Sequence, residues 1–158
     1  AEHLAFPTNF KNVTDEKPFV SNVLVVGAST NKNSALRADF SNYNKKMVNV
    51  FAPGEEIYST VPKNEYKYLQ GTSMASPVVA GGAAVLLAYM PDLKPYQIIE
   101  ALVKSSNPST ANGFTDQSQA GGVIDLKKAA EYAYTNFYKG KVSTPSKPSK
   151  SVKKAVKK

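Results

Sequence analysis

The apolar positions in the first third of the chain predict two short, fully buried strands. Residues 22–28 form a run rich in valine that ends close to Gly27, and residues 47–54 form a second run that Pro53 and Gly54 stop. Both runs are almost continuously apolar, which is typical of strands that are buried on both faces of a parallel sheet.

A hairpin and three helices are predicted after these strands. Residues 57–61 and 66–69 flank a Pro-Lys-Asn-Glu turn, which predicts a β-hairpin. The spacing of apolar residues predicts helices over about 73–90, 94–106 and 123–134. Alanine, valine and leucine surround the first of these on all sides, so it is predicted to be a central helix that is buried all round. Strands followed by helices indicate an α/β fold.

The predicted central helix lies in a stretch without charge. No residue from 69 to 90 is charged, although a proline and the pair Gly81–Gly82 interrupt the run. Only 14 residues separate Ser76 from Pro91, and a run of this length is more often a buried core helix than a membrane span. Because glycine destabilises a helix by about 1 kcal/mol relative to alanine, we expect a neighbouring element to approach both glycines closely, so that Gly81→Leu overpacks the core.

The net charge of +8 belongs to the end of the chain. Residues 139–158 hold eight lysines and no acidic residue, which leaves 12 basic and 12 acidic groups in residues 1–138. The sequence therefore predicts a formally neutral folded part over 1–138 and a Lys/Ser/Pro-rich disordered tail over 139–158. The neutral part gives no electrostatic case for nucleic-acid or membrane binding. The tail has two interpretations, a solvated spacer or a segment that contacts polyanions or a cell surface.

Rare residue types exclude several kinds of site. The chain has no cysteine, which excludes disulfides, thiolate zinc sites and cysteine nucleophiles. Its one histidine, His3, excludes zinc sites that need several imidazoles and leaves any histidine acid–base role to a single residue. The first ten residues have no basic region followed by an apolar run, so no signal peptide is visible.

The segment with the most chemical information is Gly-Thr-Ser-Met-Ala-Ser-Pro at residues 71–77. It predicts a loop that enters the central helix, because glycine allows unusual backbone angles and proline suits a first helical turn. Ser73 would then lie at a helix N-terminus, where free N–H groups and the macrodipole favour negative charge. A serine at such a place could be a nucleophile, with its own N–H donating to the oxyanion that forms. The alternative is that Ser73 or Ser76 is only the helix N-cap.

The literal string closely resembles the nucleophile motif of the subtilisin-like serine proteases, the subtilases. Neighbouring segments resemble the family in the same order between about residues 6 and 134: Phe6-Pro7, residues 25–28, Arg-Ala-Asp-Phe-Ser at 37–41, Phe-Ala-Pro-Gly at 51–54, the hairpin start at 57–60, and Val-Val-Ala-Gly at 78–81. One departure lies at Val78, where the family commonly has a helix histidine that is not the catalytic base.

This resemblance implies a fold, an activity and a set of site residues. The fold would be the C-terminal portion of the subtilisin-like three-layer α/β fold, with a parallel sheet, a β-hairpin and a buried central helix. The activity would be hydrolysis of a polypeptide substrate through an acyl-enzyme, with Ser73 as nucleophile and backbone oxyanion donor and with Gly71 and Thr72 bordering the substrate cleft. The resemblance also implies a secreted or cell-envelope location. Many subtilases bind calcium as a structural ion, but no oxygen-ligand cluster stands out in this sequence.

The other catalytic elements of the family are not found in this sequence. The family's Asp, His and oxyanion Asn all precede the matched region. His3 lacks the expected His-Gly-Thr context, and Asn9 follows Phe6-Pro7, whereas the oxyanion Asn should precede that pair. Asp39 is expected in a solvated loop and Asp125 in the first turn of a helix. None of the aspartates matches a triad motif: Asp15, Asp39, Asp92, Asp116 and Asp125.

Three explanations of the incomplete triad stay open. The chain is the C-terminal part of a longer enzyme whose upstream segment is its partner, or it completes a site with another chain, or it is a degenerate protein that kept the cleft for binding or scaffolding. An excised segment also accounts for the lack of an initiator methionine, which favours the first explanation. Since a serine hydroxyl is a weak nucleophile without a base, we expect the chain alone to be nearly inert.

Overall fold

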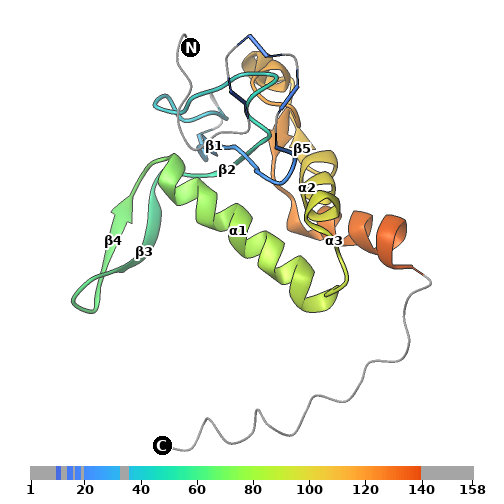
Figure 1. The fold of residues 1–158 in the computed structure, drawn as a ribbon. Helices are drawn as coiled ribbons and strands as arrows, with labels where there is room; N and C mark the ends of the chain where they lie inside the picture. The colour runs from blue at the N-terminus through green and yellow to red at the C-terminus, as the bar shows by residue number, and fades with distance from the viewer. Residues whose placement is uncertain (1–9, 12–13, 16, 19, 33–35, 140–158) are drawn as a thin grey trace, which may run out of the picture.

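A computed structural model describes residues 10–139 except 12–13, 16, 19 and 33–35 (Figure 1). Four strands form one sheet in the order β1 (Val26–Ser29), β2 (Val50–Pro53), β6 (Gly122–Val123) and β5 (Asn107–Pro108), and two more form a hairpin, β3 (Ile57–Val61) and β4 (Glu65–Leu69). The helices are α1 (Thr72–Tyr89), α2 (Pro95–Lys104) and α3 (Leu126–Ala133), with a 3-10 helix at Ala111–Asp116 and a π-helical turn at Tyr134–Tyr138. The disordered tail predicted over 139–158 lies outside the described residues except for Lys139.

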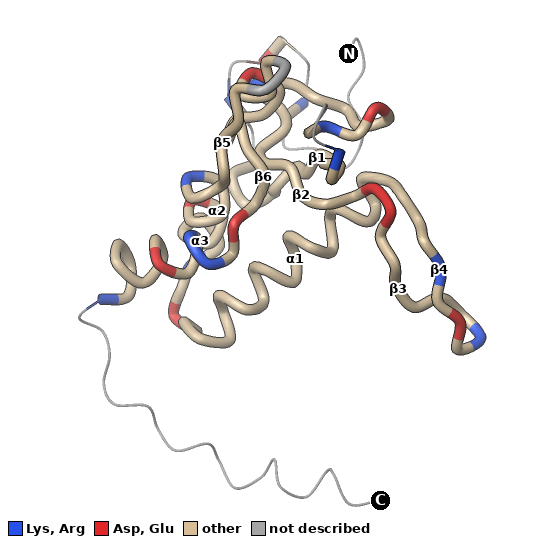
Figure 2. Tube along the Cα trace, turned by 180° about the vertical axis from the view of Figure 1, so that it is seen from behind, with Lys and Arg blue, Asp and Glu red and all other residues tan. Residues whose placement is uncertain are grey.

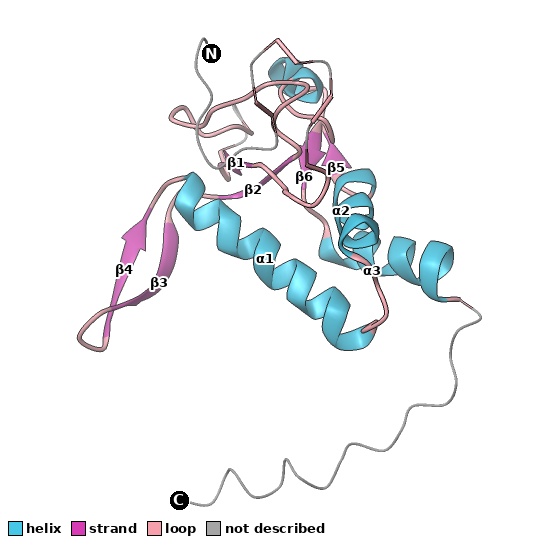
Figure 3. Ribbon diagram, viewed as in Figure 1, coloured by secondary structure: helices cyan, strands magenta, loops and turns pink. Residues whose placement is uncertain are grey.

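The sheet confirms the predicted α/β class with parallel strands. β1 and β2 run parallel with Val26 opposite Val50, and β2 pairs in parallel with β6 through Phe51 and Val123. β5 adds two antiparallel residues at the far edge. Parallel strands need crossover connections. Residues 30–49 join β1 to β2 without a helix among the described residues, whereas the connection from β2 to β6 contains α1 and α2 (Figure 3).

The alternation of side chains along β2 separates two apolar clusters. Val50 and Ala52 face the larger cluster, which α1, α2 and α3 share. Phe51 points to the opposite face, where its ring centroid lies 4.8 Å from that of Phe114 in the 3-10 helix. A strand that presents apolar side chains to both faces explains the almost continuous apolar run in the sequence.

The prediction that α1 is buried all round is wrong. Its buried residues, Ala75, Val79, Gly82 and Leu86, recur at helical spacing on one side. The other side is open, and Val85 is 48% exposed. The helix packs against β1, β2, α2 and α3 on the buried side, and Figure 2 shows it without a charged residue along its length.

By length and mean hydropathy (1.4) α1 would pass as a membrane span, but one such helix among the described residues is a weak indication, since core helices pass the same test.

The start of the third helix differs from the one predicted, while the hairpin is confirmed. The helix predicted to start at residue 123 begins at Leu126, because Gly122 and Val123 are drawn into the sheet as β6. The hairpin carries a cluster of exposed tyrosine rings, in which the rings of Tyr58 and Tyr66 are stacked with their centroids 5.6 Å apart. It projects away from the rest of the described chain next to the start of α1 (Figure 1).

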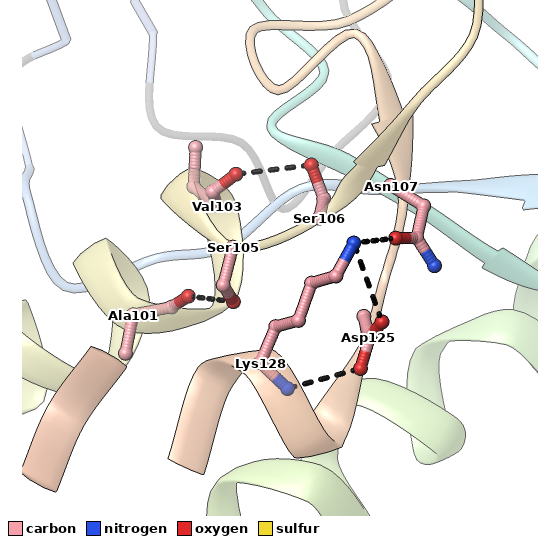
Figure 4. A network of polar contacts seen from close by, with 7 residues as sticks. All are labelled: Ala101, Val103, Ser105, Ser106, Asn107, Asp125 and Lys128. Atoms are coloured by element: carbon pink, nitrogen blue, oxygen red, sulfur yellow. Dashed lines mark hydrogen bonds and ion pairs between the residues drawn. The ribbon is translucent and has the colours of Figure 1, made fainter. Parts of the chain in front are cut away.

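Polar contacts close the end of α2 and, separately, join β5 to the start of α3 (Figure 4). The Ser105 hydroxyl donates back to the Ala101 carbonyl, and the Ser106 hydroxyl donates to the Val103 carbonyl. Asp125 is the N-cap of α3 rather than a first-turn residue, and its carboxylate accepts the Lys128 N–H at 3.0 Å. The Lys128 ammonium reaches back to the Asn107 side-chain oxygen, which ties α3 to β5.

This cap makes stability depend on pH. The backbone hydrogen bond from Lys128 is the main cause that lowers the pKa of the Asp125 carboxyl. A lowered pKa in the folded chain means that the stabilisation is present above the unfolded pKa and is lost as pH falls through the folded value. We expect Asp125→Ala to lower the thermal midpoint at neutral pH, and the gap to the parent to close in acid. Glu131→Ala, on the same helix but with no recorded ion pair among the described residues, is the control and should change the midpoint little.

The two helix glycines differ, which corrects the expectation for Gly81. A β-carbon added at Gly81 meets nothing within 4 Å, whereas one at Gly82 would run into the Leu126 side chain. We expect Gly82→Leu to lower the free energy of unfolding by about 1–3 kcal/mol through overpacking. Gly81→Leu should raise it by up to about 1 kcal/mol, since leucine is the better helix former. Chemical denaturation of both variants checks this, and equal effects would contradict the assigned packing.

Candidate active site

The helix that carries the predicted nucleophile begins at Gly71. This residue is the N-cap, with φ +151°, a conformation that side chains rarely adopt. Its carbonyl accepts the N–H groups of Met74 at 3.0 Å and Ala75 at 3.3 Å. No side chain caps the helix, so the interpretation of Ser73 or Ser76 as an N-cap is wrong.

Pro77 is not in the first turn, as the sequence predicted, but is the sixth residue of α1. A proline at this place has no N–H to donate to the carbonyl four residues earlier, which is that of Ser73. The Ser73 carbonyl therefore lacks its usual helical donor, and the backbone at Ser73 has fewer helical hydrogen bonds than the backbone deeper in α1.

Two backbone donors are free beside the Ser73 hydroxyl. In the described part of the chain, no acceptor is recorded for the N–H of Thr72 or of Ser73. Both residues are exposed, and no acidic residue lies in the first turn. Unpaired N–H groups at the positive end of a helix dipole favour an anion or a developing oxyanion.

Ser73 borders an open groove of about 710 Å³. Its walls are residues 23–26 on one side and the start of α1 on the other, with Ser73, Ser76 and Ala80 on the helix side. Every side chain that lines it is apolar or an alcohol, and none titrates near neutral pH. The groove therefore contains a hydroxyl and free N–H donors but no group that would take a proton from the hydroxyl.

The structure brings together Gly71, Thr72 and Ser73, and it places the aspartates elsewhere. Asp39 lies in an exposed loop as predicted, Asp116 is 4.0 Å from Lys45, and Asp125 caps α3. His3, Phe6-Pro7 and Asn9 lie outside the described residues. No group of three potential metal-ligating His, Cys, Asp or Glu side chains occurs in the part that the structure describes.

Sequence reasoning missed one residue that holds this loop in place. The Gly71 N–H donates to the Gly54 carbonyl at 2.7 Å, so the loop before α1 is fastened to the end of β2. The signal in the sequence is the Ala-Pro-Gly string, which predicts the end of a strand and resembles a family segment but does not by itself indicate a contact with the loop before α1.

An ion pair next to Gly54 joins the segments that follow β1 and β2. The Lys32 ammonium donates to the Glu55 carboxylate at 2.7 Å. This hydrogen bond lowers the pKa of Glu55, with a further contribution from Thr30, and raises the pKa of Lys32. Both groups are therefore charged at neutral pH, and they hold the two strand ends together beside the loop that leads to Ser73.

Known proteins resemble this chain over most of its length. The Subtilase family profile matches residues 1–136. Subtilisin DY from Bacillus licheniformis is 43% identical over 111 residues, which are 69% of this chain and 37% of that protein. A cell wall-associated protease of Bacillus subtilis is 38% identical over 104 residues, 66% of this chain and 11% of that protein.

A solved structure gives the same likeness in three dimensions. Fervidolysin from Fervidobacterium pennivorans, a keratinolytic enzyme related to subtilisin, superposes with a TM-score of 0.61 at 32% identity. The match covers 70% of this chain and 19% of that one. The chain thus spans well under half the length of these relatives.

Proposed function

This chain belongs to the subtilase family, and we propose that it is the C-terminal, nucleophile-bearing part of a subtilisin-like serine endopeptidase. The observation that carries the proposal is Ser73, exposed at the N-terminus of α1 beside unpaired N–H groups and within the string that resembles the family's serine motif. Gly71 and Thr72 would border the polypeptide substrate.

The chemistry that follows is acyl transfer in two steps. The Ser73 oxygen attacks the scissile carbonyl while a histidine of the upstream segment, outside this chain, takes its proton. The carbonyl oxygen becomes an oxyanion that the Ser73 N–H stabilises. The tetrahedral intermediate then expels the amine, which receives the proton from the histidine, and water releases the acyl group by the same steps.

The absent base predicts that the isolated chain is nearly inactive. In subtilisin, loss of the base lowers kcat about as much as loss of the whole triad, about a million-fold. The groove beside Ser73 has no titratable side chain that could replace it. The upstream segment of the same protease is therefore the proposed partner.

The open side of α1 and the outer edge of β1 support the proposal that an upstream segment packs on this chain. Ser29 accepts the Gly54 N–H, so alternate residues of β1 face β2 and the others face outward. Outward-facing Ala28 is paired with Ser41 and Ala38, but no described residue pairs with the backbone of Val26. An apolar helix face next to an unpaired strand edge is what a further strand of the same enzyme would cover.

The alternative function is a catalytically inactive subtilase-like binding or scaffold protein, which the lack of a base in the described residues favours. The cell wall-associated relative supports a location outside the cytoplasm, secreted or at the cell envelope. Both are proposals that rest on the family.

The serine assignment has a direct test in two forms of the protein. We expect the 158-residue chain to show no peptidase activity and no labelling by serine-directed phosphonates, because nothing activates Ser73. After it is joined to its upstream segment, Ser73 should label and peptide hydrolysis should appear. Ser73→Ala in the longer protein should remove both signals, by about a million-fold in kcat.

Ser76 is the matched control for this test, because it is an exposed serine one turn further along the same groove. Ser76→Ala should leave the free energy of unfolding within about 0.5 kcal/mol of the parent, since it caps no helix. Activity that survives Ser73→Ala would remove the nucleophile assignment, and robust activity of the 158-residue chain would show that a base lies within it.

The proposed upstream partner predicts a difference between two exposed positions. Val85→Lys, on the open side of α1, should leave the 158-residue chain unchanged but destabilise the longer protein by about 2 kcal/mol or more through burial of an unpaired charge. Tyr96→Lys, 58% exposed on α2, should affect neither form. Thermal unfolding of both variants, each in the 158-residue chain and in the longer protein, tests whether the open side of α1 is covered. Hydrogen exchange at the Val26 amide tests whether a strand is added at β1. A Val26 amide equally unprotected in both forms would contradict strand addition.

A further inference from the structure

We propose that Gly54 is a positioning residue for Ser73, which it reaches through the backbone of Gly71. The inference rests on the proposed function of Ser73 and adds a residue that has no contact with substrate. Three hydrogen bonds carry it. The Gly54 N–H donates to the Ser29 carbonyl at 3.0 Å, the Gly71 N–H donates to the Gly54 carbonyl at 2.7 Å, and the Met74 N–H donates to the Gly71 carbonyl at 3.0 Å.

This relay runs from the end of β1 to the first turn of α1. Ser73 lies between Gly71 and Met74, so its hydroxyl and N–H move with the two peptide groups that the relay holds. No side chain caps α1, and Pro77 removes the helical partner of the Ser73 carbonyl. The backbone of Gly54 therefore provides the link from the sheet to the loop that sets where the helix begins.

The space around Gly54 shows why a side chain would disturb the relay. A β-carbon there would lie 2.6 Å from the Ala28 β-carbon and 2.8 Å from the Gly71 carbonyl oxygen. Neither atom can turn away by a change of rotamer, because one is the short side chain of a strand residue and the other is backbone. That oxygen is also the acceptor for Met74 and Ala75, so a shift of Gly71 is passed to the first turn of α1.

Gly27 provides a matched control in the neighbouring strand. It is buried like Gly54, and a β-carbon there would run into the Phe51 ring. The Phe51 ring packs on the face of the sheet away from α1, against Phe114. Gly27→Ala should therefore strain the sheet without displacing Gly71.

The expected consequence is on the chemical step rather than on substrate binding. Reacting groups must lie within a narrow range of positions, and a displacement of about 1 Å can lower the rate about 100-fold. Substrate contacts made by other parts of the enzyme would remain, so KM should change little while kcat falls.

The test uses the protein joined to its upstream segment and compares the parent with Gly54→Ala and Gly27→Ala. We expect Gly54→Ala to lower kcat and the rate of phosphonate labelling at Ser73 by about tenfold or more, with KM within about threefold. Gly27→Ala should keep kcat within about threefold of the parent, even if its thermal midpoint falls as much as that of Gly54→Ala. Equal loss of kcat in both variants, or full kcat in Gly54→Ala, would overturn the positioning role.

A second variant covers the case in which Gly54→Ala does not fold. Adding Ala28→Gly removes the closer of the two clashes and leaves the one with the Gly71 oxygen. The double variant should fold and have a kcat below that of Ala28→Gly alone; an equal kcat would count against the proposal. A Ser73→Ala arm separates the two claims. Activity that does not need Ser73 refutes the proposed function, whereas activity that needs Ser73 but ignores Gly54→Ala refutes only the positioning role.

Discussion

The arrangement of the candidate site depends on one backbone hydrogen bond, from the Gly71 N–H to the Gly54 carbonyl. It fastens the loop before α1 to the end of the sheet, and it requires a close approach at Gly54, where an added β-carbon would lie 2.8 Å from the Gly71 carbonyl oxygen. Gly71 needs its unusual φ for the loop to turn into the helix, and Gly54 needs the absence of a β-carbon. This bond holds the residue at which α1 begins, and the first N–H groups of α1, those of Thr72 and Ser73, have no acceptor among the described residues, as is usual at a helix N-terminus.

The charge-free helix α1 has two sides with different surroundings. One side is buried against the sheet and the other helices, while the other, with Val85, is exposed in this chain. We propose that the upstream segment covers this exposed apolar area and the neighbouring outward-facing backbone of Val26, with which no described residue pairs. The groove that holds Ser73 lies between the start of α1 and residues 23–26, and none of the side chains that line it could act as a base.

The elements of the fold were largely predictable, because their signals are local. The β-hairpin, both early strands and the central helix lie where hydrophobic periodicity and turn residues predict them. The start of α3 and the strand β6 were not predictable, since Gly122 and Val123 become a strand only by pairing with Pro108 and Phe51. Strand pairing between residues far apart in sequence leaves no local pattern in a two-residue segment.

The sequence by itself determined the family resemblance, the α/β class, the position of Ser73 ahead of an apolar helix and the lack of a second histidine. These depend on residue identity and on spacing within one segment. The tertiary structure alone decided that Gly71 rather than a serine caps α1, that Gly82 and not Gly81 is closely approached, and that Gly54 holds the loop. The contacts of Gly82 and Gly54 join segments that are separate in sequence, and such contacts arise only when the chain packs. The cap at Gly71 is local, but its N–H is held by the Gly54 carbonyl, a partner that the local sequence does not show.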